Sequence, residues 1–451
     1  MHNICNLKSR RELFVDDWLI EKMSGVELKL HSPVPQETVL VLDRPWEGTI
    51  SYDPVVMKDG ERFRMWYRGS GEDWEAQVTC YAESSDGIHW ARPELGIFEF
   101  DGSEKNNIVL KGEAAKALCV FRDGNPDVPE EERYKGTGIG PKIGDQATWR
   151  GFVSPDGLHW ELIDPDPLLL APADDWPWFD SHNISFWDSE QKQYVGYLRG
   201  WLQPGVRAIR RSISSDFRSW SELEFIDVGD GPLQHLYKNS CTQYFRAPHI
   251  YLMFPKRFVP ERRLIDDWDS VGISEAVFMS SRDGIRWDRR FLEAFLRPGL
   301  DQNNWTDRSM YIGPTLIQTG PAELSLYYME HYKHPTCCLR RGTLRLDGFV
   351  SVNARWAGGE FVTHPLSFEG SELVINHSTS AAGSIRVEVQ NEDGRPLDGF
   401  AMQDCQEIFG DEIERVVDWG SGSGLGALAG KTIRLRFAMQ DADLYAVQFR
   451  G

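Results

Sequence analysis

A Ser-x-Asp-x-x-x-Trp pattern returns four times in the first two thirds of the chain, and it limits the possible folds more than any other feature. The copies are Ser84 to Trp90, Ser154 to Trp160, Ser214 to Trp220 and Ser280 to Trp287. A weaker fifth copy, Leu346-Asp347-Gly348-Phe349, keeps the turn but lacks the tryptophan. The aspartates of the five copies recur at intervals of 60 to 70 residues: Asp86, Asp156, Asp216, Asp283 and Asp347. A near-constant interval indicates repeated supersecondary units.

Each copy predicts a strand that ends in a tight turn and is followed by another strand, because Asp tolerates turn geometry and Gly supplies a positive φ. We expect the tryptophan to pack between adjacent sheets. Two short apolar runs precede the turn, for example 54–58 and 62–67 around Asp59-Gly60. Four short strands per unit are typical of a propeller blade. Five copies therefore predict five blades.

The pattern stops near Ala354, and a different rhythm follows. The segments 372–375, 384–389, 432–437 and 444–449 alternate or run apolar between Gly, Asn and Asp turns, as in a small antiparallel sandwich. The sequence thus predicts an all-β protein. We expect a five-bladed β-propeller in residues 1–353, which would be the catalytic domain, followed by a β-sandwich in residues 354–451.

Composition limits the partners of the protein. A formal net charge of −20 argues against nucleic acid and against anionic membrane surfaces, since both need a positive footprint. The chain shows no run of 18 apolar residues and no charged-then-apolar leader, so neither a membrane span nor a signal peptide is predicted. Seven irregularly spaced cysteines predict no zinc site and favour a cytoplasmic setting. A secreted or periplasmic location stays open if a leader has been removed, and the oligomeric state is left open.

Polar residues from different blades are expected on one face of the propeller. The innermost strand of each blade lines the central channel, and function usually lies on the face where that strand starts. Alignment of the repeats places there Asp53, Asp180, His182, Asn183, Asn239, Asp307 and Tyr311, and at the ends of the second strands Arg68, Arg199, Lys256, Glu330 and His331. This alignment predicts a ring of carboxylates and cations at the mouth of a channel.

Two carboxyl groups with separated pKa values are what glycoside hydrolysis requires, because one donates a proton to the leaving oxygen and the other acts as base or nucleophile. Asp53 is the first choice for the ionised member. The alternative is that Asp53-Pro54 is an ordinary turn at the start of a strand.

The chain resembles the five-bladed β-propeller glycoside hydrolases of families 43, 32, 68 and 117 over residues 10 to 350, with a C-terminal sandwich like that of family 32. The resemblance rests on Ser-Tyr-Asp53-Pro54, on the Ser-x-Asp-Gly-x-x-Trp turns and on the segment Phe179-Asp180-Ser181-His182-Asn183. It implies a nucleophile or base, a transition-state stabiliser and a general acid on successive blades.

Asp53 matches the first of these three positions. Asp180 is the nearest match to the acid, and Glu330 is its substitute. Arg122-Asp123 resembles the motif of the stabiliser, but Gly124 replaces its proline.

The cations Arg68, Arg199 and Lys256 admit two interpretations. They indicate a negatively charged sugar such as a uronate, bound through charge-assisted contacts, or they neutralise the carboxylates of the channel. Aromatic residues on nearby loops are candidates for stacking on sugar faces: Trp74, Trp176, Trp178, Trp201 and Trp305.

The leading hypothesis is a glycosidase that cleaves a terminal sugar from an oligosaccharide or polysaccharide. One alternative is a polysaccharide lyase with His182 or His331 as base, and another is a non-catalytic carbohydrate-binding propeller. No cofactor is required by the motifs, and no nucleotide motif occurs. A structural Ca²⁺ in the channel is left open, with no metal-ligand spacing that demands it.

Overall fold

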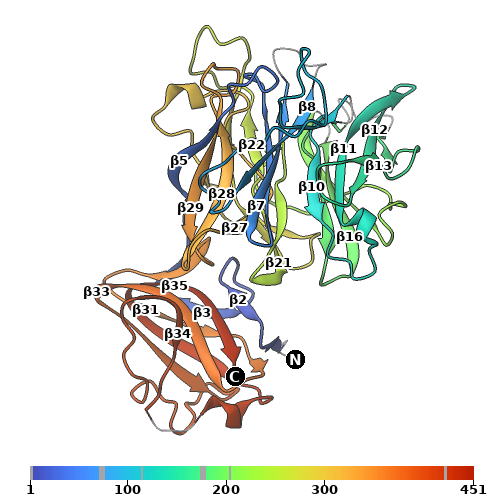
Figure 1. Ribbon diagram of the computed structural model, residues 1–451. Coiled ribbons are helices and arrows are strands. Elements are labelled where there is room, and N and C mark those ends of the chain that lie inside the picture. The colour runs from blue at the N-terminus through green and yellow to red at the C-terminus, as the bar shows by residue number, and fades with distance from the viewer. Residues whose placement is uncertain (1–3, 71–76, 113–114, 173–178, 203–204, 421–423) are drawn as a thin grey trace. The chain divides into compact units, whose positions relative to one another are not determined.

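The computed structural model describes residues 4–70, 77–112, 115–172, 179–202, 205–420 and 424–451. The protein divides into two compact units (Figure 1). The larger unit spans residues 33–244 and 248–343, and the smaller spans 1–32, 245–247 and 344–451. The sequence predicts a single boundary at 353, whereas here the first 32 residues belong with the C-terminal ones.

The prediction of an all-β protein is confirmed. Helical turns in the described part of the chain are short 3-10 segments: η2 (Glu130–Glu132), η3 (Gln302–Asn304) and η4 (Leu425–Leu428). All longer elements are strands, which are described sheet by sheet below.

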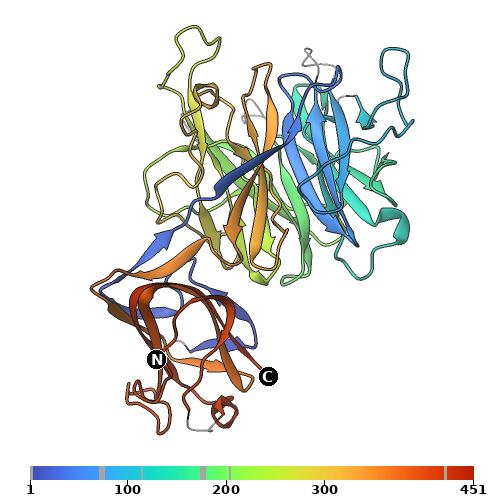
Figure 2. The same cartoon turned by 60° about the vertical axis from the view of Figure 1, so that its left-hand side comes forward.

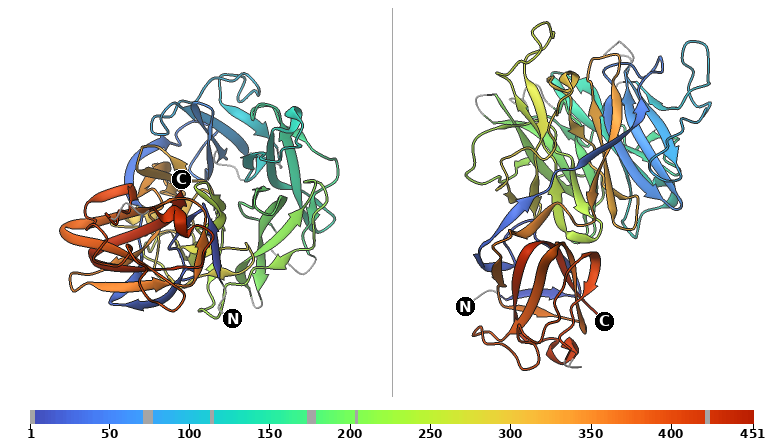
Figure 3. Two further views of the ribbon diagram at one scale, coloured as in Figure 1. Left: turned by 90° about the horizontal axis from the view of Figure 1, so that it is seen from below. Right: turned by 90° about the vertical axis from the view of Figure 1, so that its left-hand side faces the viewer.

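Five sheets of four or five strands follow one another in the described part of the larger unit, and Figure 3 (left) shows them around a circle. The first has the order β6 (Tyr52–Asp59), β7 (Arg62–Gly69), β8 (Val78–Ser84) and β9 (Ile108–Lys111). The second has β10 (Cys119–Arg122), β11 (Tyr134–Ile143), β12 (Gln146–Ser154) and β13 (Glu161–Leu162), and β14 (Leu169–Leu170) also pairs with β12. The third has β15 (Ile184–Asp188), β16 (Gln193–Leu202), β17 (Val206–Ser214) and β18 (Glu224–Phe225).

The fourth sheet has β20 (Cys241–Tyr244), β21 (Ala247–Met253), β24 (Met279–Ser281) and β25 (Trp287–Asp288). The fifth has β26 (Tyr311–Ile312), β28 (Glu323–Glu330), β29 (Cys338–Arg345) and β5 (Val34–Val41), and β27 (Ile317–Gln318) also pairs with β28. A separate small sheet is formed by β19 (His235–Leu236), β22 (Lys256–Val259) and β23 (Ile273–Ala276).

The outer edge of the fifth sheet comes from the other end of the unit in sequence. Strand β5 pairs antiparallel with β29, from Cys338↔Val41 to Thr343↔Val34. Figure 2 shows β5 in dark blue beside the orange strands of this sheet. The first strand of the larger unit is therefore held by its last sheet.

The Ser-x-Asp turns share one hydrogen-bond pattern. In the first copy the Ser84 hydroxyl accepts from the Gly87 amide at 2.9 Å, and Asp86 Oδ1 accepts from the amides of Ile88 and His89 at 2.8 Å. The same bonds recur at Asp156, Asp216 and Asp283, where Ser281 rather than Ser280 takes the serine position. Each aspartate therefore holds its turn by accepting backbone amides, which is ordinary Asx-turn chemistry.

These turns also join neighbouring sheets. Tyr327 on β28 contacts the Gly87 carbonyl as a donor, Trp66 on β7 donates to Gly157 at 2.8 Å, and Tyr197 on β16 donates to Gly284 at 2.8 Å. The repeated tryptophans pack edge-on against a neighbouring sheet, as in the pair Trp149 and Trp220 with ring centroids 4.9 Å apart. Each turn thus packs on the preceding sheet of the circle.

The smaller unit contains an antiparallel sheet in which two long strands, β33 (Glu372–Gln390) and β35 (Arg434–Arg450), pair along most of their length. The sheet has the path β3 (Ile20–Ser24), β31 (Gly359–Thr363), β35, β30 (Val350–Ala354) and β4 (Val26–Leu30), with β2 (Arg11–Leu13) on β35 and β34 (Asp411–Val416) on β33. A second sheet pairs β1 (Cys5–Lys8) in parallel with β32 (Leu366–Phe368). The strands β2, β3 and β4 explain why residues 1–32 belong to this unit.

Candidate functional site

The Asp53-Pro54 pair forms an irregularity in the first strand of the larger unit's first sheet. The pairing of β6 with β7 shifts register between Tyr52 and Val55, so the two residues between them stand outside the regular ladder. Proline lacks the amide that a regular ladder would use, which suits this bulge. Asp53 has a φ of 62°, a left-handed conformation that costs a non-glycine residue about 1–3 kcal/mol and often marks functional sites.

Cations and a histidine surround the Asp53 carboxylate, whose residue is only 1% exposed. Oδ1 forms an ion pair with the Lys238 ammonium and lies 3.9 Å from His182 Nδ1, while Oδ2 lies 3.7 Å from an Arg68 guanidinium nitrogen. Oδ2 accepts no hydrogen bond from any described residue. Burial raises the pKa of Asp53, but Lys238, His182 and Arg68 together outweigh burial and lower it. Asp53 is therefore ionised.

Lys238 is the principal partner of Asp53. Its ammonium nitrogen lies 3.8 Å from the ring centroid of Tyr52 and 4.2 Å from that of Tyr311, so aromatic faces enclose it. Burial lowers the pKa of Lys238 to about 7, with Asp53 opposing the shift and Arg68 adding to it. The alignment of the repeats placed Asn239 in the site and missed Lys238, its neighbour.

His182 and Tyr311 were predicted at this face and meet there. Nδ1 of the fully buried His182 lies 2.6 Å from the Tyr311 hydroxyl. Burial lowers the pKa of His182 to about 4, although Asp53 raises it. The imidazole is therefore neutral at neutral pH.

Asp180 is the carboxylate that solvent reaches, because its side chain is 50% exposed. Its oxygens lie 3.1 Å from Lys116 Nζ and 3.8 Å from an Arg199 nitrogen. Burial raises the pKa of Asp180, but Lys116 and Arg199 outweigh it and lower the pKa. Lys116 was not identified from the sequence.

A group of cations surrounds the ring of Tyr237. Lys256 Nζ lies 4.3 Å from the ring centroid, and the guanidinium carbons of Arg199 and Arg207 each lie 4.8 Å from it. Arg199 and Arg207 also lie 4.5 Å and 5.0 Å from the ring of Trp201, which was predicted as a sugar-stacking residue. In this structure Trp201 supports the arginines.

Asp307 lies at the edge of the same region. Its Oδ2 is 3.3 Å from the Arg308 guanidinium, and its Oδ1 accepts from the Trp268 indole at 3.3 Å. Arg308 also donates to the Tyr332 hydroxyl at 2.7 Å. Arg308 and Arg207 were absent from the sequence-based set, because nothing in their local sequence separates them from surface arginines.

The side chains of two predicted binding residues, Asn183 and Asn239, form hydrogen bonds with the backbone. The Asn183 amide donates to the Phe179 carbonyl at 2.9 Å, and its oxygen accepts from the Arg199 amide at 3.0 Å. Asn239 likewise donates to the Tyr197 carbonyl at 2.9 Å and accepts from the Cys241 amide at 3.1 Å. These asparagines hold the segments that carry the neighbouring charged residues.

Glu330 and His331 belong to a different network. Glu330 pairs with Arg340 at 2.7 Å and accepts from Asn304 at 3.2 Å. His331 Nε2 lies 2.9 Å from Asp301 Oδ2, and its Nδ1 lies 2.7 Å from the Thr336 hydroxyl. Neither Asp53 nor a residue that contacts it is among these partners.

Of the remaining candidates, Asp123 is held by Lys135 on β11 at 2.6 Å and by the Tyr194 hydroxyl on β16 at 2.8 Å. The Trp305 indole donates to the Gly299 carbonyl at 2.9 Å. Trp74, Trp176 and Trp178 lie outside the described residues. Within the described ranges, no group of three or more His, Cys, Asp or Glu side chains is arranged to hold a metal ion.

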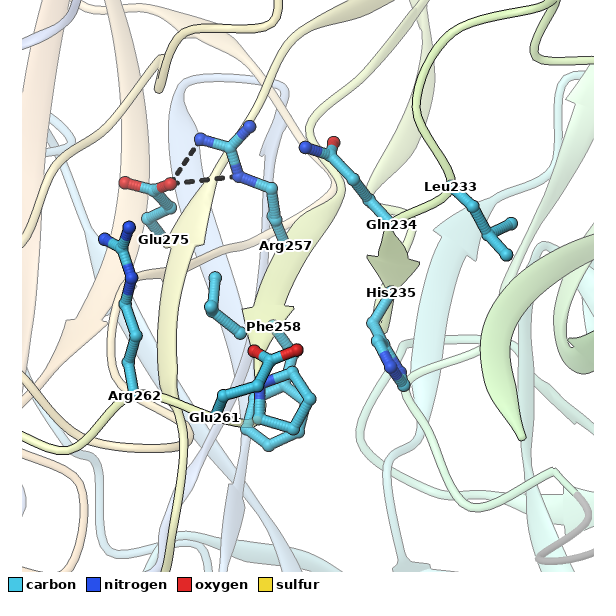
Figure 4. A pocket seen from close by; sticks show the side chains of 10 residues that line it. Leu233, Gln234, His235, Arg257, Phe258, Glu261, Arg262 and Glu275 are labelled. Atoms are coloured by element: carbon cyan, nitrogen blue, oxygen red, sulfur yellow. Dashed lines mark hydrogen bonds and ion pairs between the residues drawn. The ribbon is translucent and has the colours of Figure 1, made fainter. Parts of the chain in front are cut away.

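A separate pocket of about 390 Å³ lies along the strands β19 and β22 (Figure 4). Arg257 points toward Glu275 in this pocket, and its Nε donates to the carboxylate at 2.9 Å. Successive residues of a strand face opposite sides. Lys256 and Arg257 are successive residues of β22, so their side chains lie on opposite sides of the strand. Arg257 is neutralised by Glu275, whereas Lys256 belongs to the cation group around Tyr237.

No family model matches the chain. Two curated Mycobacterium tuberculosis proteins are similar to part of it: the uncharacterized protein MT1551 of strain CDC 1551 / Oshkosh is 30% identical, and the uncharacterized protein Rv1502 of strain ATCC 25618 / H37Rv is 36% identical, each over 153 residues. These matches cover 33% of this chain and 44% of each relative. The chain thus spans less than half the length of the curated relatives that it matches.

Similar solved structures include a glycoside hydrolase, which is 15% identical with a TM-score of 0.49, over 70% of this chain and 92% of that one. A thermostable family-43 glycoside hydrolase is 14% identical with a TM-score of 0.45, over 66% of this chain and 91% of that one. An N-acetylgalactosamine deacetylase from F. plautii in complex with blood group B trisaccharide is also similar, with 15% identity and a TM-score of 0.44 over 71% of this chain and 95% of that one. In the described residues, no helix has the length and apolar character that a membrane span requires.

Proposed function

We propose that the protein is a glycoside hydrolase whose larger unit is a five-bladed β-propeller and whose smaller unit is a β-sandwich. The observation that carries the proposal is Asp53. It is a buried, ionised carboxylate in a left-handed conformation, with one oxygen that accepts no hydrogen bond from the described residues. A strained backbone and an unsatisfied buried acceptor both cost free energy, and such costs are concentrated at functional sites.

Asp53 acts as the base or nucleophile. Lys238 and Arg68 keep it ionised, and the neutral His182 lies beside it. Oδ2 accepts no hydrogen bond from the described residues, and its proposed target is a water molecule or the anomeric carbon, as for an ionised carboxylate in glycoside hydrolysis.

Asp180 is the proposed acid, since it is the acidic side chain of the site that reaches solvent. Lys116 and Arg199 lower its pKa in the free protein. A substrate with an acidic group would engage these cations and weaken their hold on Asp180. The pKa of Asp180 would then rise toward the value that a proton donor needs. An oligosaccharide that carries a uronate or another acidic sugar is therefore the proposed substrate class.

The test is turnover of neutral and uronate-containing aryl glycosides and oligosaccharides, followed by the release of reducing ends. We expect Asp53→Asn to lower kcat by about 10²–10⁴-fold, the usual contribution of a catalytic proton-transfer group. Asp101→Asn is the matched control, because Asp101 is exposed in a turn of the larger unit, and it should leave kcat unchanged. If the wild type is active and Asp53→Asn turns over the same substrate equally fast, Asp53 is not the base or nucleophile.

Lyase chemistry is the second candidate, and the pKa of Lys238 near 7 favours it. A group that exchanges protons near neutral pH is suited to removing the proton next to a uronate carboxylate, while Arg68 and Arg199 stabilise the resulting charge. An absorbance increase from an unsaturated product, without hydrolysis, would assign the protein to this class.

A further inference from the structure

Lys256 is a buried amine for which the described part of the chain offers no hydrogen-bond acceptor. It is 1% exposed, and its Nζ has no hydrogen-bond partner among the described residues. Its backbone is fixed, because the Lys256 amide donates to the Lys238 carbonyl at 2.8 Å and the Tyr237 amide donates to the Lys256 carbonyl at 2.8 Å. A buried polar group without a partner needs an explanation, and recognition of a ligand is one.

The described carboxylates of the region, Asp53, Asp180 and Asp307, are engaged by other cations. Asp53 is paired with Lys238, Asp180 with Lys116 and Asp307 with Arg308. By contrast, the ring of Tyr237 that Lys256 contacts is shared with the further cations Arg199 and Arg207. Among the described residues, positive charge around Tyr237 is thus in excess, in a protein whose net charge is −20.

We propose that Lys256, together with Arg199, Arg207 and Arg308, binds an oxyanion of the ligand: a carboxylate, sulfate or phosphate group. The inference rests on the proposed function, since this group would be the acidic substituent of the sugar. The oxyanion supplies the acceptor that Lys256 lacks, and arginines match the fork geometry of such groups.

The electrostatics of Lys256 agree with an anion that arrives from outside. Burial lowers the pKa of Lys256 well below its usual range, Lys238 and Arg308 lower it further, and Asp307 and Asp53 oppose them. A bound anion reverses part of this shift, so the amine takes up a proton when the anion binds. Asp180 and Arg308 are partly exposed, at 50% and 28%.

The neighbouring residue on the same strand shows why Lys256 is distinctive. Arg257 is neutralised by Glu275 in the pocket of Figure 4. No described carboxylate forms an ion pair with Lys256 in this way. An anion is therefore expected at Lys256 and not at Arg257.

Calorimetric titration of the full chain tests the proposal with sodium glucuronate, inorganic phosphate, sodium sulfate and, as the neutral comparison, glucose. We expect the wild type to bind at least one oxyanion and not glucose, with proton uptake at pH 7.5 in buffers of different ionisation enthalpy. Lys256→Met should weaken binding at least 10-fold and reduce the uptake. Lys58→Met, which changes an exposed lysine at the far end of β6, should change neither.

Arg207→Gln serves as a second variant if Lys256→Met does not fold. It should also weaken oxyanion binding, because Arg207 is part of the same group and is only partly buried. Preference for glucuronate identifies a carboxylate ligand, and preference for phosphate or sulfate identifies an ester; either supports the inference. No oxyanion binding by the wild type, or unchanged binding in the folded variants, would overturn it.

The titration also separates this inference from the proposed function. Lys256-dependent oxyanion binding without hydrolysis of any glycan would retain the inference and remove the hydrolase. Hydrolysis of neutral glycans without oxyanion binding would retain the hydrolase and remove the inference.

Discussion

Two kinds of aspartate in the larger unit differ in almost every respect. The turn aspartates Asp86, Asp156, Asp216 and Asp283 accept backbone amides in the same way each time. Asp53 occurs once, is buried, faces Lys238 and Arg68, and leaves one oxygen without a hydrogen bond from the described residues. The comparison shows that the repeated aspartates build the fold, whereas Asp53, which is not part of the repeat, lies in the candidate site.

The largest expected effect concerns the ion pair of Asp53. Lys238→Met leaves a buried carboxylate without its principal partner, and breaking a buried pair costs about 3–5 kcal/mol in the free energy of unfolding. Urea unfolding measures this cost. Lys333→Met is the control, because the partner Asp269 is exposed and exposed pairs contribute about 0–1 kcal/mol. Equal costs for the two variants would remove the distinction between site and surface.

The pH dependence of stability separates the site from the turns in a second way. The folded pKa of His182 is about 4, below the ordinary value of 6.5. The unfolded state therefore binds more protons between these values, and the folded state loses about 3 kcal/mol of stability as the pH falls from 6.5 to 4. His182→Gln should flatten this part of the curve in urea unfolding at several pH values. A curve that keeps its slope in the variant would contradict the assignment.

A turn aspartate should affect stability without affecting chemistry. Asp156→Ala removes the acceptor of two backbone amides and should cost about 1 kcal/mol, with kcat unchanged. Asp145→Ala, in an exposed turn between β11 and β12, should cost less.

Burial raises the pKa of Asp156, but hydrogen bonds from His159 and Leu158 outweigh it and lower the pKa to about 2. The resulting stabilisation is present above the ordinary aspartate pKa and is lost as the pH falls toward 2.

The smallest effect is expected at Glu330. Its partners are Arg340 and Asn304, so Glu330→Gln should change kcat less than about twofold, within the scatter of substitutions away from the chemistry. Turnover on the same glycan panel checks this. A loss comparable to that of Asp53→Asn would instead make Glu330 the acid in place of Asp180.

The sequence allowed prediction of the features that local patterns encode. The Ser-x-Asp turns, the all-β class and the position of Asp53 at the start of a strand follow from residues close together in the chain. Lys238, Arg207 and Arg308 could not be found this way, because their role depends on which sheets face Tyr237 and Asp53. The opposite error occurred at Asn183 and Asn239, which look like binding residues in sequence but bond to the backbone in three dimensions.

The pairing of β5 with β29 has a consequence for how the chain reaches its folded state. Val34 is made early in synthesis, yet its partner Thr343 follows about 300 positions later. Contacts of such long sequence separation form slowly, because the entropy of closing a long loop comes before any gain from pairing. Until then β5 is an unpaired strand edge, and its Pro35 and charged Glu37 are residues that discourage association with other chains. The last sheet is therefore completed only after the four sheets between these strands have been synthesised.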